Sequence, residues 1–379
     1  MERTRPRPSG APPPVGARPR ACPSALSTEI WKAFSPMVQC RWPPARRGAP
    51  SVKHLWASAL RAPKARPTRT WKGVVKMKVG LVGIGTMGTQ IGKAILAGGH
   101  EVIARDIDPA AEARAREMGA VVVDSPKAVA ERTDLALLSL PLPSDVAEVV
   151  LREHDGLLAG AKPGYVIVDL STVDPLSTQR NYGIAKEKGV GYLDAPVLGR
   201  PQTCGKWTLP VGGDAEALEK ARPVLDLLAK RVVHVGPSGW GDLVKVLNNM
   251  MFAAINSITV EIMALCAKMG MDPKILYETI AQSGAASVSN LFIELGPKIL
   301  ARDFDPRFTV DLLYKDVSLG LEIARAVKAP LLITPACQLL NEMGRAKGLG
   351  PQDTSALVHI YEEFLGVTVQ PQEGEGGKA

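Results

Sequence analysis

The sequence predicts an α/β protein with a doubly wound, mainly parallel sheet. An all-helical domain follows, joined to the sheet by a long interdomain helix. Three observations lead to this prediction. A glycine-rich loop joins the first apolar strand to a helix, strand and helix patterns alternate to about residue 238, and the pattern from residue 239 is helical. We therefore expect four segments: residues 1–76, 77–238, 239–367 and a flexible tail at 368–379.

The first segment differs in composition from the rest of the chain. Residues 1–76 hold 16 Lys and Arg against 2 Asp and Glu, whereas residues 77–379 hold 30 against 36. The segment also carries 13 of the 31 prolines, so we expect it to be disordered. Three interpretations compete: an over-extended start or dispensable leader before Met77, a targeting peptide, and a basic arm for nucleic acid. The charge of the remaining chain does not suggest nucleic acid binding.

Composition also bears on the broad class of protein. The chain has 379 residues, of which 46% are hydrophobic and 22% charged, as in ordinary globular proteins. We find no run of the roughly 18 apolar residues that a membrane span needs, so we expect no membrane insertion. The five cysteines are odd in number and form no CxxC pair, which predicts a reducing, cytoplasmic compartment and no metal site.

The glycine loop is the strongest single motif. An apolar strand at residues 78–82 runs into Gly83-Ile84-Gly85-Thr86-Met87-Gly88, and a helix follows from about Thr89 to Ala97. Gly83 permits a tight turn, Gly85 lets the backbone approach a pyrophosphate, and Gly88 lets helix and strand pack closely. The helix N-terminus then favours phosphate groups. This order predicts a Rossmann-type dinucleotide-binding domain whose cofactor contacts all six loop residues.

The acidic residue after the second strand predicts which dinucleotide binds. A strand at residues 101–105 ends on Asp106, 18 residues beyond Gly88, where a carboxylate can accept hydrogen bonds from both ribose hydroxyls. Asp106 would repel the 2′-phosphate of NADP, and Ile107 offers no cation, so we expect NAD rather than NADP. Arg105 opposes this expectation, because its guanidinium could reach a phosphate.

Strand and helix patterns alternate after the loop. We expect strands at residues 120–123, 135–139, 165–170, 191–193 and 232–235, separated by helices that include 174–188 and 214–229. Loops at the carboxyl ends of such strands line the ligand cleft. They contain Leu140-Pro141 and Thr172. On position alone, a cofactor contact is as good an interpretation for these residues as a strand terminator or a helix cap.

A long apolar helix opens the second half of the chain. Its pattern runs from about residue 242 to 269 without proline and is apolar nearly all round, which predicts burial between domains or subunits. Further helices are expected at residues 273–283, 310–327, 332–347 and 354–364. The long helix also predicts a homodimer or homotetramer.

Two polar residues interrupt the apolar start of this helix. Lys245 and Asn249 are four residues apart and share one face. From spacing alone, the simpler interpretation is a lysine that reaches solvent at the helix edge. The functional interpretation is a proton donor with a lowered pKa in a cleft, beside an amide that orients substrate. Lys315-Asp316 is a second pair, which alone is most often a surface ion pair.

Together these residues resemble the β-hydroxyacid dehydrogenase family, best known for 3-hydroxyisobutyrate dehydrogenase. The resemblance extends from about residue 77 to 364, and four motifs match in order. The first is GLVGIGTMG, which ends at Gly88, and the second is Asp194-Ala195-Pro196-Val197. The third begins with Gly236, Gly239 and Gly241 and continues to Lys245 and Asn248-Asn249. The fourth is Lys315-Asp316. Four motifs at family-like spacing are more specific than any one of them, and they favour the functional interpretation of Lys245.

The resemblance implies a role for each matching residue. Lys245 is implied as the catalytic acid/base, and Asn249 as a hydrogen-bond partner of the substrate. Lys315 is implied to lie against the nicotinamide end of the cofactor, and Asp316 to support the substrate site. The remaining matches to cofactor contacts of the family are Leu140, Pro141, Thr172 and, more weakly, Asp145.

One motif departs from the family pattern. Relatives usually continue Asp-Ala-Pro-Val with Ser-Gly-Gly, whose amides bind the substrate carboxylate, but here Leu198-Gly199-Arg200-Pro201 follows. Our hypothesis is that Arg200, beside Leu198 and Gly199, binds an anionic substrate group, because a guanidinium suits carboxylates. The alternative is an arginine that packs structurally or faces solvent. Trp207 is expected in the core or at the pocket wall. The departure leaves the identity of the substrate open.

These observations favour an oxidoreductase that transfers a hydride between NAD and a small, 3-hydroxyisobutyrate-like β-hydroxy acid. One alternative is an NADPH-dependent reductase of glyoxylate or succinic semialdehyde, against which Asp106 argues. An imine reductase on the same scaffold is disfavoured, because such relatives generally lack the lysine. The alternative from another class is a cofactor-binding protein with a basic nucleic-acid-binding arm, against which Lys245, Asn249 and Lys315 argue.

Overall fold

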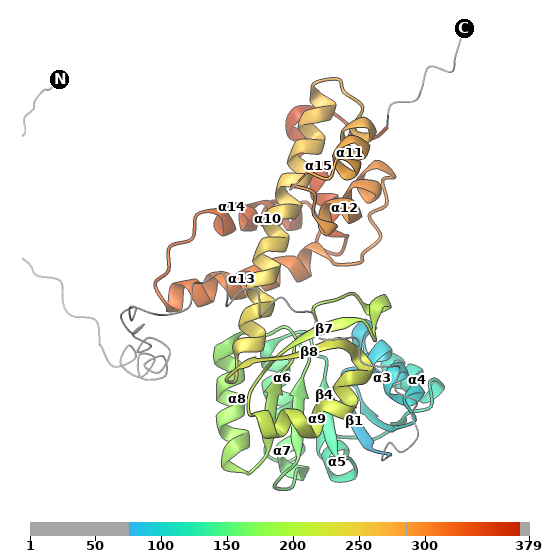
Figure 1. Cartoon of the computed structure of the whole chain (residues 1–379), viewed down its shortest axis with the longest axis vertical. Helices are drawn as coiled ribbons and strands as arrows, with labels where there is room; N and C mark the ends of the chain where they lie inside the picture. Colours follow the sequence, from blue (N-terminus) through green and yellow to red (C-terminus); the bar gives the residue numbers. More distant parts are fainter. Residues whose placement is uncertain (1–75, 286, 372–379) are drawn as a thin grey trace, which may run out of the picture. The chain divides into compact units, whose positions relative to one another are not determined.

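The computed structural model describes residues 76–285 and 287–371 (Figure 1). The interpretations of the first segment therefore fall, except for Lys76, outside the described residues, as does the tail from residue 372. The described residues belong to one structural unit. The expected division of this unit near residue 238 stays a prediction.

The chain from residue 78 to 236 builds an eight-stranded sheet. Its strands lie in the order β3-β2-β1-β4-β5-β6-β7-β8, and all neighbours pair in parallel except β6 and β7. The predicted doubly wound, mainly parallel sheet is confirmed. The strands are β1 (Lys78–Val82), β2 (Glu101–Arg105), β3 (Val121–Val122), β4 (Leu135–Leu138), β5 (Val166–Asp169), β6 (Gly191–Asp194), β7 (Trp207–Gly212) and β8 (Ala229–Gly236).

The sheet is buried on both faces. In β4, Leu135 and Leu137 belong to one apolar cluster, whereas Ala136 and Leu138 belong to another. Successive side chains of a strand point to opposite faces, so the strand is an unbroken apolar run. Connecting helices cover both faces: α3 (Thr86–Ala97), α4 (Pro109–Glu117), α5 (Pro126–Arg132), α6 (Pro143–Leu151), α7 (Leu157–Gly160), α8 (Pro175–Glu187) and α9 (Ala215–Leu228).

Local sequence explains where several of these helices begin. The side chains of Asp108, Ser125 and Asp174 each accept hydrogen bonds from backbone N–H groups in the first turn of α4, α5 and α8. A proline follows each of these caps, and it needs no hydrogen-bond partner at that position. The predicted start of α3 at Thr89 was late, because the helix begins at Thr86 and takes in the end of the glycine loop.

Strand β7 was missed in the sequence. Its Pro210 and terminal Gly212 are residues that usually argue against a strand inside a sheet. Trp207 nevertheless lies 1% exposed in the core, and its indole Nε1 donates a hydrogen bond of 2.7 Å to the carbonyl of Arg200. Trp207 is therefore a core residue that also fixes the chain at Arg200.

The second half is all-helical, as predicted. The helix α10 (Trp240–Lys268), the yellow helix of Figure 1, contacts each of the five α-helices that follow. These are α11 (Pro273–Gln282), α12 (Asn290–Leu300), α13 (Val310–Ala326), α14 (Ile333–Ala346) and α15 (Val358–Leu365). A short 3₁₀ turn at Thr354–Leu357 begins the segment that the sequence predicted as one helix. Helix α12 was not predicted from the sequence, because it contains Pro297 and proline usually breaks a helix.

Helix α10 also corrects an expectation drawn from composition. By length and apolar content this helix could cross a membrane, although the sequence pattern predicted no such segment. Its residues Val260, Met263 and Ala264 are fully buried in the core of the helical half. These contacts are those of a core helix, and the same helix also touches β7 and β8.

Residue 369, which was predicted to lie in a flexible tail, is part of the folded core. Val369 is fully buried, and its backbone N–H donates a hydrogen bond of 2.6 Å to the carboxylate of Glu362. The predicted start of a flexible tail at residue 368 was therefore too early, because an apolar side chain at 369 completes the helical core.

Candidate functional site

The glycine loop has the geometry of a phosphate cradle. Gly83 has a φ of +92°, and a Cβ there would lie 2.2 Å from the carbonyl oxygen of Ser139. A Cβ on Gly88 would lie 2.0 Å from the carbonyl oxygen of Gly83, so both positions exclude a side chain. A Cβ on Gly85 would meet none of the described residues within 4 Å. Gly85 caps α3 without a side-chain hydrogen bond, so the space before the helix N-terminus suits a pyrophosphate.

Asp106 is held against this loop. One carboxylate oxygen accepts a hydrogen bond of 2.5 Å from the backbone N–H of Ile84, and the other accepts one of 2.9 Å from Asp108. Arg105 forms an ion pair of 2.6 Å with Glu112. The guanidinium that the sequence offered as a candidate phosphate ligand therefore already has a carboxylate partner.

A cavity of about 410 Å³ lies next to the loop. Ten of the predicted site residues line it: Thr86, Met87, Leu140, Pro141, Thr172, Gly199, Arg200, Lys245, Lys315 and Asp316. The other predicted residues do not: Gly83, Ile84, Gly85, Gly88, Asp106, Asp145, Leu198 and Asn249. Leu198 instead exchanges backbone hydrogen bonds with Thr208, and its side chain is only partly exposed. One cavity thus collects residues from the glycine loop, from the segments after β4, β5 and β6, and from α10 and α13.

Lys245 points into this cavity rather than to open solvent. Its Nζ donates a hydrogen bond of 2.9 Å to the carbonyl oxygen of Val197. Burial lowers the pKa of Lys245, Asp316 opposes this effect, and the positive charges of Lys315 and Arg200 add to it. The interpretation of a lysine reaching solvent at the helix edge is therefore wrong for this side chain.

Lys315 joins α13 to the two predicted cofactor loops. Its Nζ donates to the carbonyl oxygens of Thr172 (2.9 Å) and Pro141 (3.2 Å) and pairs with Asp316 at 3.0 Å. The two loops are also tied to each other, because the backbone N–H of Leu140 donates to the hydroxyl of Ser171. The pair of Lys315 and Asp316 is therefore not a surface ion pair.

Asn249 lies behind the cavity wall. Its Nδ2 donates a hydrogen bond of 2.5 Å to Asp316, and its Oδ1 accepts one of 3.0 Å from Asn248. Asn249 and Asp316 are 3% and 2% exposed. This buried contact links α10 to α13 and fixes the carboxylate beside Lys315.

Asp194, the first residue of the second motif, has a structural position. Its buried carboxylate accepts hydrogen bonds from the backbone N–H groups of Gly239 (2.8 Å) and Asp242 (3.1 Å) at the start of α10. Burial raises the pKa of Asp194 to about 6. The pKa of Asp242 lies well above its ordinary value, because of burial and then of the nearby carboxylates of Asp194 and Asp169. The sequence analysis did not identify Asp242, since one acidic residue in a helical first turn is common.

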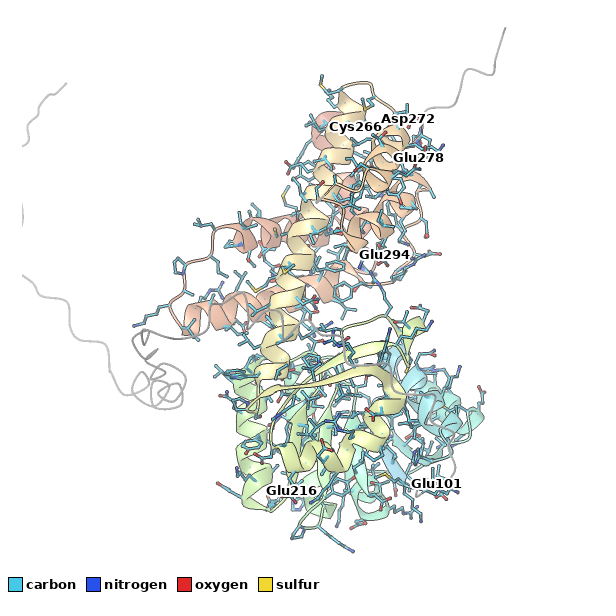
Figure 2. The ribbon with its side chains drawn as sticks, in the orientation of Figure 1. Glu101, Glu216, Cys266, Asp272, Glu278 and Glu294 are labelled. Carbon is cyan, nitrogen blue, oxygen red and sulfur yellow. The ribbon has the colours of Figure 1, made fainter. Side chains whose placement is uncertain are left out.

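Two further charged residues, Glu294 and Arg307, lie at the site and were not identified from the sequence. Arg200 forms an ion pair of 2.5 Å with Glu294 of α12, a residue marked in Figure 2. Arg307, in the loop before α13, lines the cavity and lies 3.7 Å from the same carboxylate. Neither belongs to a local motif, and α12 itself was not predicted. The sequence held no signal that would have paired them with Arg200.

Comparison with known proteins decides the family. Residues 78–236 match the family described as the NAD binding domain of 6-phosphogluconate dehydrogenase. Residues 239–361 match the one described as NAD-binding of NADP-dependent 3-hydroxyisobutyrate dehydrogenase. The 2-(hydroxymethyl)glutarate dehydrogenase of Eubacterium barkeri is 35% identical over 295 residues, which are 77% of this chain and 97% of that protein. This chain belongs to the β-hydroxyacid dehydrogenase family.

Other members of the family agree with this assignment. The 2-hydroxy-3-oxopropionate reductase of Escherichia coli K12 is 33% identical over 76% of this chain and 97% of its own length. A solved structure of Mycobacterium tuberculosis 3-hydroxyisobutyrate dehydrogenase matches with a TM-score of 0.69 and 27% identity, over 76% of this chain and 99% of that chain. The predicted resemblance is confirmed. The protein is an NAD(P)-dependent oxidoreductase of hydroxy acids, and its glycine loop fits NAD.

Proposed function

We propose that this family member oxidises a small β-hydroxy acid with NAD, or reduces the corresponding aldehyde or keto acid, with Lys245 as the general acid/base. One observation carries the proposal. The amino group of Lys245 lies in the same cavity as Thr86 and Met87 of the glycine loop and Lys315 of α13. A proton-transfer group and the cofactor loop therefore border one space of small-molecule size.

NAD, when bound, supplies the acceptor for the hydride that leaves the hydroxyl-bearing carbon. Gly83–Gly88 would hold its pyrophosphate, Asp106 its adenosine ribose, and the loops joined by Lys315 its nicotinamide end. Lys245 takes the proton from the substrate hydroxyl, for which it must be neutral. Burial helps here, since a lower pKa leaves more of the amine free at neutral pH. In the reducing direction the ammonium returns this proton.

Asp316 lines the cavity, and Asn249 supports it from behind the wall. The Nδ2 of Asn249 donates to the carboxylate of Asp316, so Asn249 would act on the substrate through Asp316. We propose that Asp316 positions both Asn249 and Lys315, since it contacts each of them. Its charge also keeps the pKa of Lys245 from falling further.

Arg200 takes the place of the serine and glycine amides that usually bind the substrate carboxylate. It lines the cavity and is 28% exposed, and among the described residues its guanidinium hydrogen-bonds to Glu294, which leaves other N–H groups to bind an anion. Relatives are named for 2-(hydroxymethyl)glutarate, 2-hydroxy-3-oxopropionate and L-threonate. We propose a hydroxy acid of similar size for this protein, in place of a strictly 3-hydroxyisobutyrate-like one.

The preference for NAD over NADP rests on two side chains. The Asp106 carboxylate, held at the glycine loop, would repel the 2′-phosphate of NADP. The neighbouring guanidinium of Arg105 is already paired with Glu112, so it is less able to bind that phosphate. We expect NADP to bind at least tenfold more weakly, the size of one unfavourable charge contact of about 1.4 kcal/mol.

The proposal includes a homodimer or homotetramer in the cytoplasm. Leu247, Met251, Ile258 and Leu265 of α10 are each at least half exposed. Their spacings of four, seven and seven residues place them on one helix face. An apolar stripe of this kind suits a second copy of the chain. The three described cysteines are free thiols, which suits a reducing compartment.

The test uses the purified full chain. NAD and NADP are titrated by calorimetry, and reduced nicotinamide is followed by absorbance with a panel of small β-hydroxy acids. We expect turnover of at least one acid with NAD, and its loss in Lys245→Met with NAD affinity unchanged. NAD binding without turnover of any acid would contradict the proposed substrate class, and binding of neither nucleotide would contradict the cofactor assignment.

A further inference from the structure

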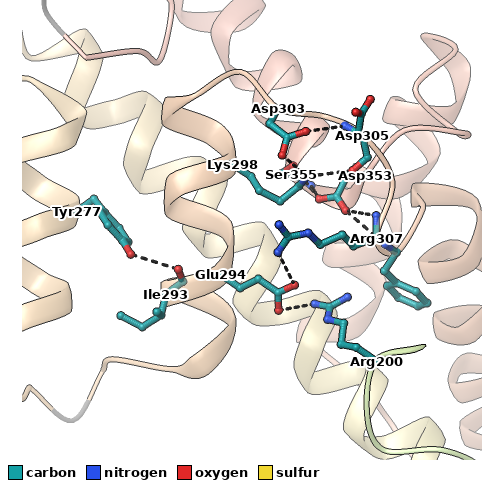
Figure 3. Close-up of polar contacts among 11 residues, drawn as sticks. Arg200, Tyr277, Ile293, Glu294, Lys298, Asp303, Asp305, Arg307, Asp353 and Ser355 are labelled. Atoms are coloured by element: carbon teal, nitrogen blue, oxygen red, sulfur yellow. Dashed lines mark hydrogen bonds and ion pairs between the residues drawn. The ribbon is translucent and has the colours of Figure 1, made fainter. Parts of the chain in front are cut away.

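We infer that the cavity accepts a hydroxy acid with a second carboxylate, and that Arg307 binds this second group. The inference rests on the proposed function, because it names the substrate class of the same cavity. Three charged side chains carry it. Arg200, Glu294 and Arg307 point toward one another from three separate parts of the chain (Figure 3).

One carboxylate serves two guanidinium groups in this cluster. Glu294 lies 2.5 Å from Arg200 through one oxygen and 3.7 Å from Arg307 through the other. A single negative charge cannot neutralise two positive charges, so one positive charge remains in excess. Because both arginines line the cavity, this excess charge attracts an anionic group that enters it.

Arg307 has more binding capacity left than Arg200. Its side chain is 51% exposed, and its contact with Glu294 is longer than a hydrogen bond. Its backbone N–H donates to Asp353 at 2.9 Å, which holds the residue in place. Within the described residues its guanidinium makes no hydrogen bond. A fixed backbone with an open five-donor head group is suited to a carboxylate.

The neighbouring Lys298 is a buried cation whose hydrogen-bond partners lie within the protein. Lys298 is 5% exposed, and its Nζ contacts the carbonyl oxygen of Asp305 at 2.9 Å and the carboxylate of Asp303 at 3.1 Å (Figure 3). Lys298 is thus a structural residue. Arg307 lines the cavity and, among the described residues, makes no such short contacts through its guanidinium.

Each of the two arginines is assigned to one carboxylate of the substrate. A hydroxy acid with one carboxylate needs one cation beside Lys245, and Arg200 supplies it in the proposed function. A second carboxylate on the same small molecule finds Arg307 lining the same cavity. The substrate class is therefore a short dicarboxylic hydroxy acid, and Arg307 is its specificity-determining residue.

The experiment compares matched substrates on the full-length enzyme with NAD. The probes are 2-(hydroxymethyl)succinate and its distal monoamide, which has the same shape with one charge fewer. We expect the wild type to favour the diacid in kcat/KM by at least about tenfold, the scale of one charge-assisted hydrogen bond. Arg307→Met should remove this preference by raising the KM for the diacid, with the monoamide unchanged, and Arg307→Lys should keep part of it.

The matched control is Arg325→Met, which removes an exposed arginine of α13 outside the cavity. It should leave both substrates unchanged. A wild type that does not favour the diacid would overturn the inference. So would an Arg307→Met variant that loses both substrates equally, or one that binds NAD more weakly, because Arg307 would then serve the fold or the cofactor.

A second measurement separates this inference from the proposed function. If no hydroxy acid is turned over, the proposed function fails, and calorimetric binding of 2-(hydroxymethyl)succinate to the NADH-loaded enzyme still tests Arg307. Binding that weakens about tenfold in Arg307→Met and not in Arg325→Met would support the inference. Equal binding by the wild type and both variants would overturn it.

Discussion

At the residue scale, the site depends on side chains whose partners lie far away in the sequence. Lys245 contacts Val197 across 48 positions, and Arg200 meets Glu294 across 94. Burial makes the amine of Lys245 easier to deprotonate, and the carboxylate of Asp316 limits this effect. In the proposed function, the balance between burial and the charge of Asp316 sets the pH range in which Lys245 can accept a proton.

Lys245→Met should lower kcat/KM by roughly 10²–10⁴, the usual contribution of a general acid/base. In the wild type, kcat/KM for oxidation should rise with pH and level off below 10.5, the ordinary lysine pKa, because the base must be neutral and its pKa is lowered. The variant should lose this rising limb. Lys162→Met, an exposed lysine outside the cavity, is the control. A variant that kept the wild-type pH profile would remove Lys245 from the mechanism.

At the scale of elements, the site is built where element ends meet. The glycine loop joins β1 to α3 through backbone contacts too close for any side chain. Lys315 ties α13 to the loops after β4 and β5, and Asp194 ties β6 to the start of α10. Each tie uses a hydrogen bond to the backbone, so it fixes the position of a whole element.

Two glycine substitutions should separate fold from cofactor binding. Gly88→Ala places a Cβ 2.0 Å from a carbonyl oxygen, and we expect a loss of roughly 2–4 kcal/mol in unfolding free energy. Gly85→Ala meets none of the described residues within 4 Å, so its Tm should stay close to that of the wild type. Its methyl group enters the proposed pyrophosphate space, and NAD should bind at least about tenfold more weakly. Unchanged NAD affinity in Gly85→Ala would show that the phosphates lie elsewhere.

The buried carboxylates at the start of α10 predict a pH-dependent stability. Asp194 has a pKa of about 6 in the folded protein and a lower one when unfolded, so the folded state holds the proton longer. The unfolding free energy should therefore fall as pH rises from about 4 to about 6, by roughly 2–3 kcal/mol for a shift of this size. Chemical denaturation across this range measures the slope.

Asp242→Asn tests the second carboxylate of this pair. The amide oxygen can still accept the hydrogen bond of Thr178, and the group no longer ionises. Because the pKa of Asp242 is raised in the same direction, the variant should lose less stability than the wild type between acid and neutral pH. Asp226→Asn, which changes an exposed carboxylate, is the control. Equal pH slopes in all three proteins would show that Asp242 is already ionised in the folded state.

At the scale of the whole molecule, α10 carries an exposed apolar stripe that the described residues leave uncovered. The core of the helical half covers one side of α10 and leaves Leu247, Met251, Ile258 and Leu265 exposed. An apolar stripe left in water is unfavourable by roughly 25 cal/mol per Å². Association with a second copy would cover it.

Met251→Glu should convert the proposed oligomer to monomers, because a charge would be buried in the interface. Light scattering after size-exclusion chromatography measures the mass, with Ile275→Glu of α11, an exposed residue on another helix, as the control. An unchanged mass in Met251→Glu would place the interface elsewhere. A monomeric wild type would contradict the oligomer itself.

The sequence by itself determined the elements that depend on local pattern. The glycine loop, the apolar strands, the helix caps and the long helix could be located, because hydrophobic periodicity and backbone-specific residues act over a few positions. Strand β7 and helix α12 escaped because Pro210 and Pro297 locally argue against a strand and a helix. The motifs that contain Lys245 and Lys315 were identified through the family resemblance, because spacing alone favoured a solvent-facing lysine.

Only the tertiary structure decided which side chains share the cavity. The direction of Lys245, the position of Asn249 behind the wall, and the cluster of Arg200, Glu294 and Arg307 all arise from packing between distant elements. The physical reason is that side-chain contacts across elements depend on how buried faces fit together. Local periodicity specifies which face is buried, but it does not specify the partner on the other side.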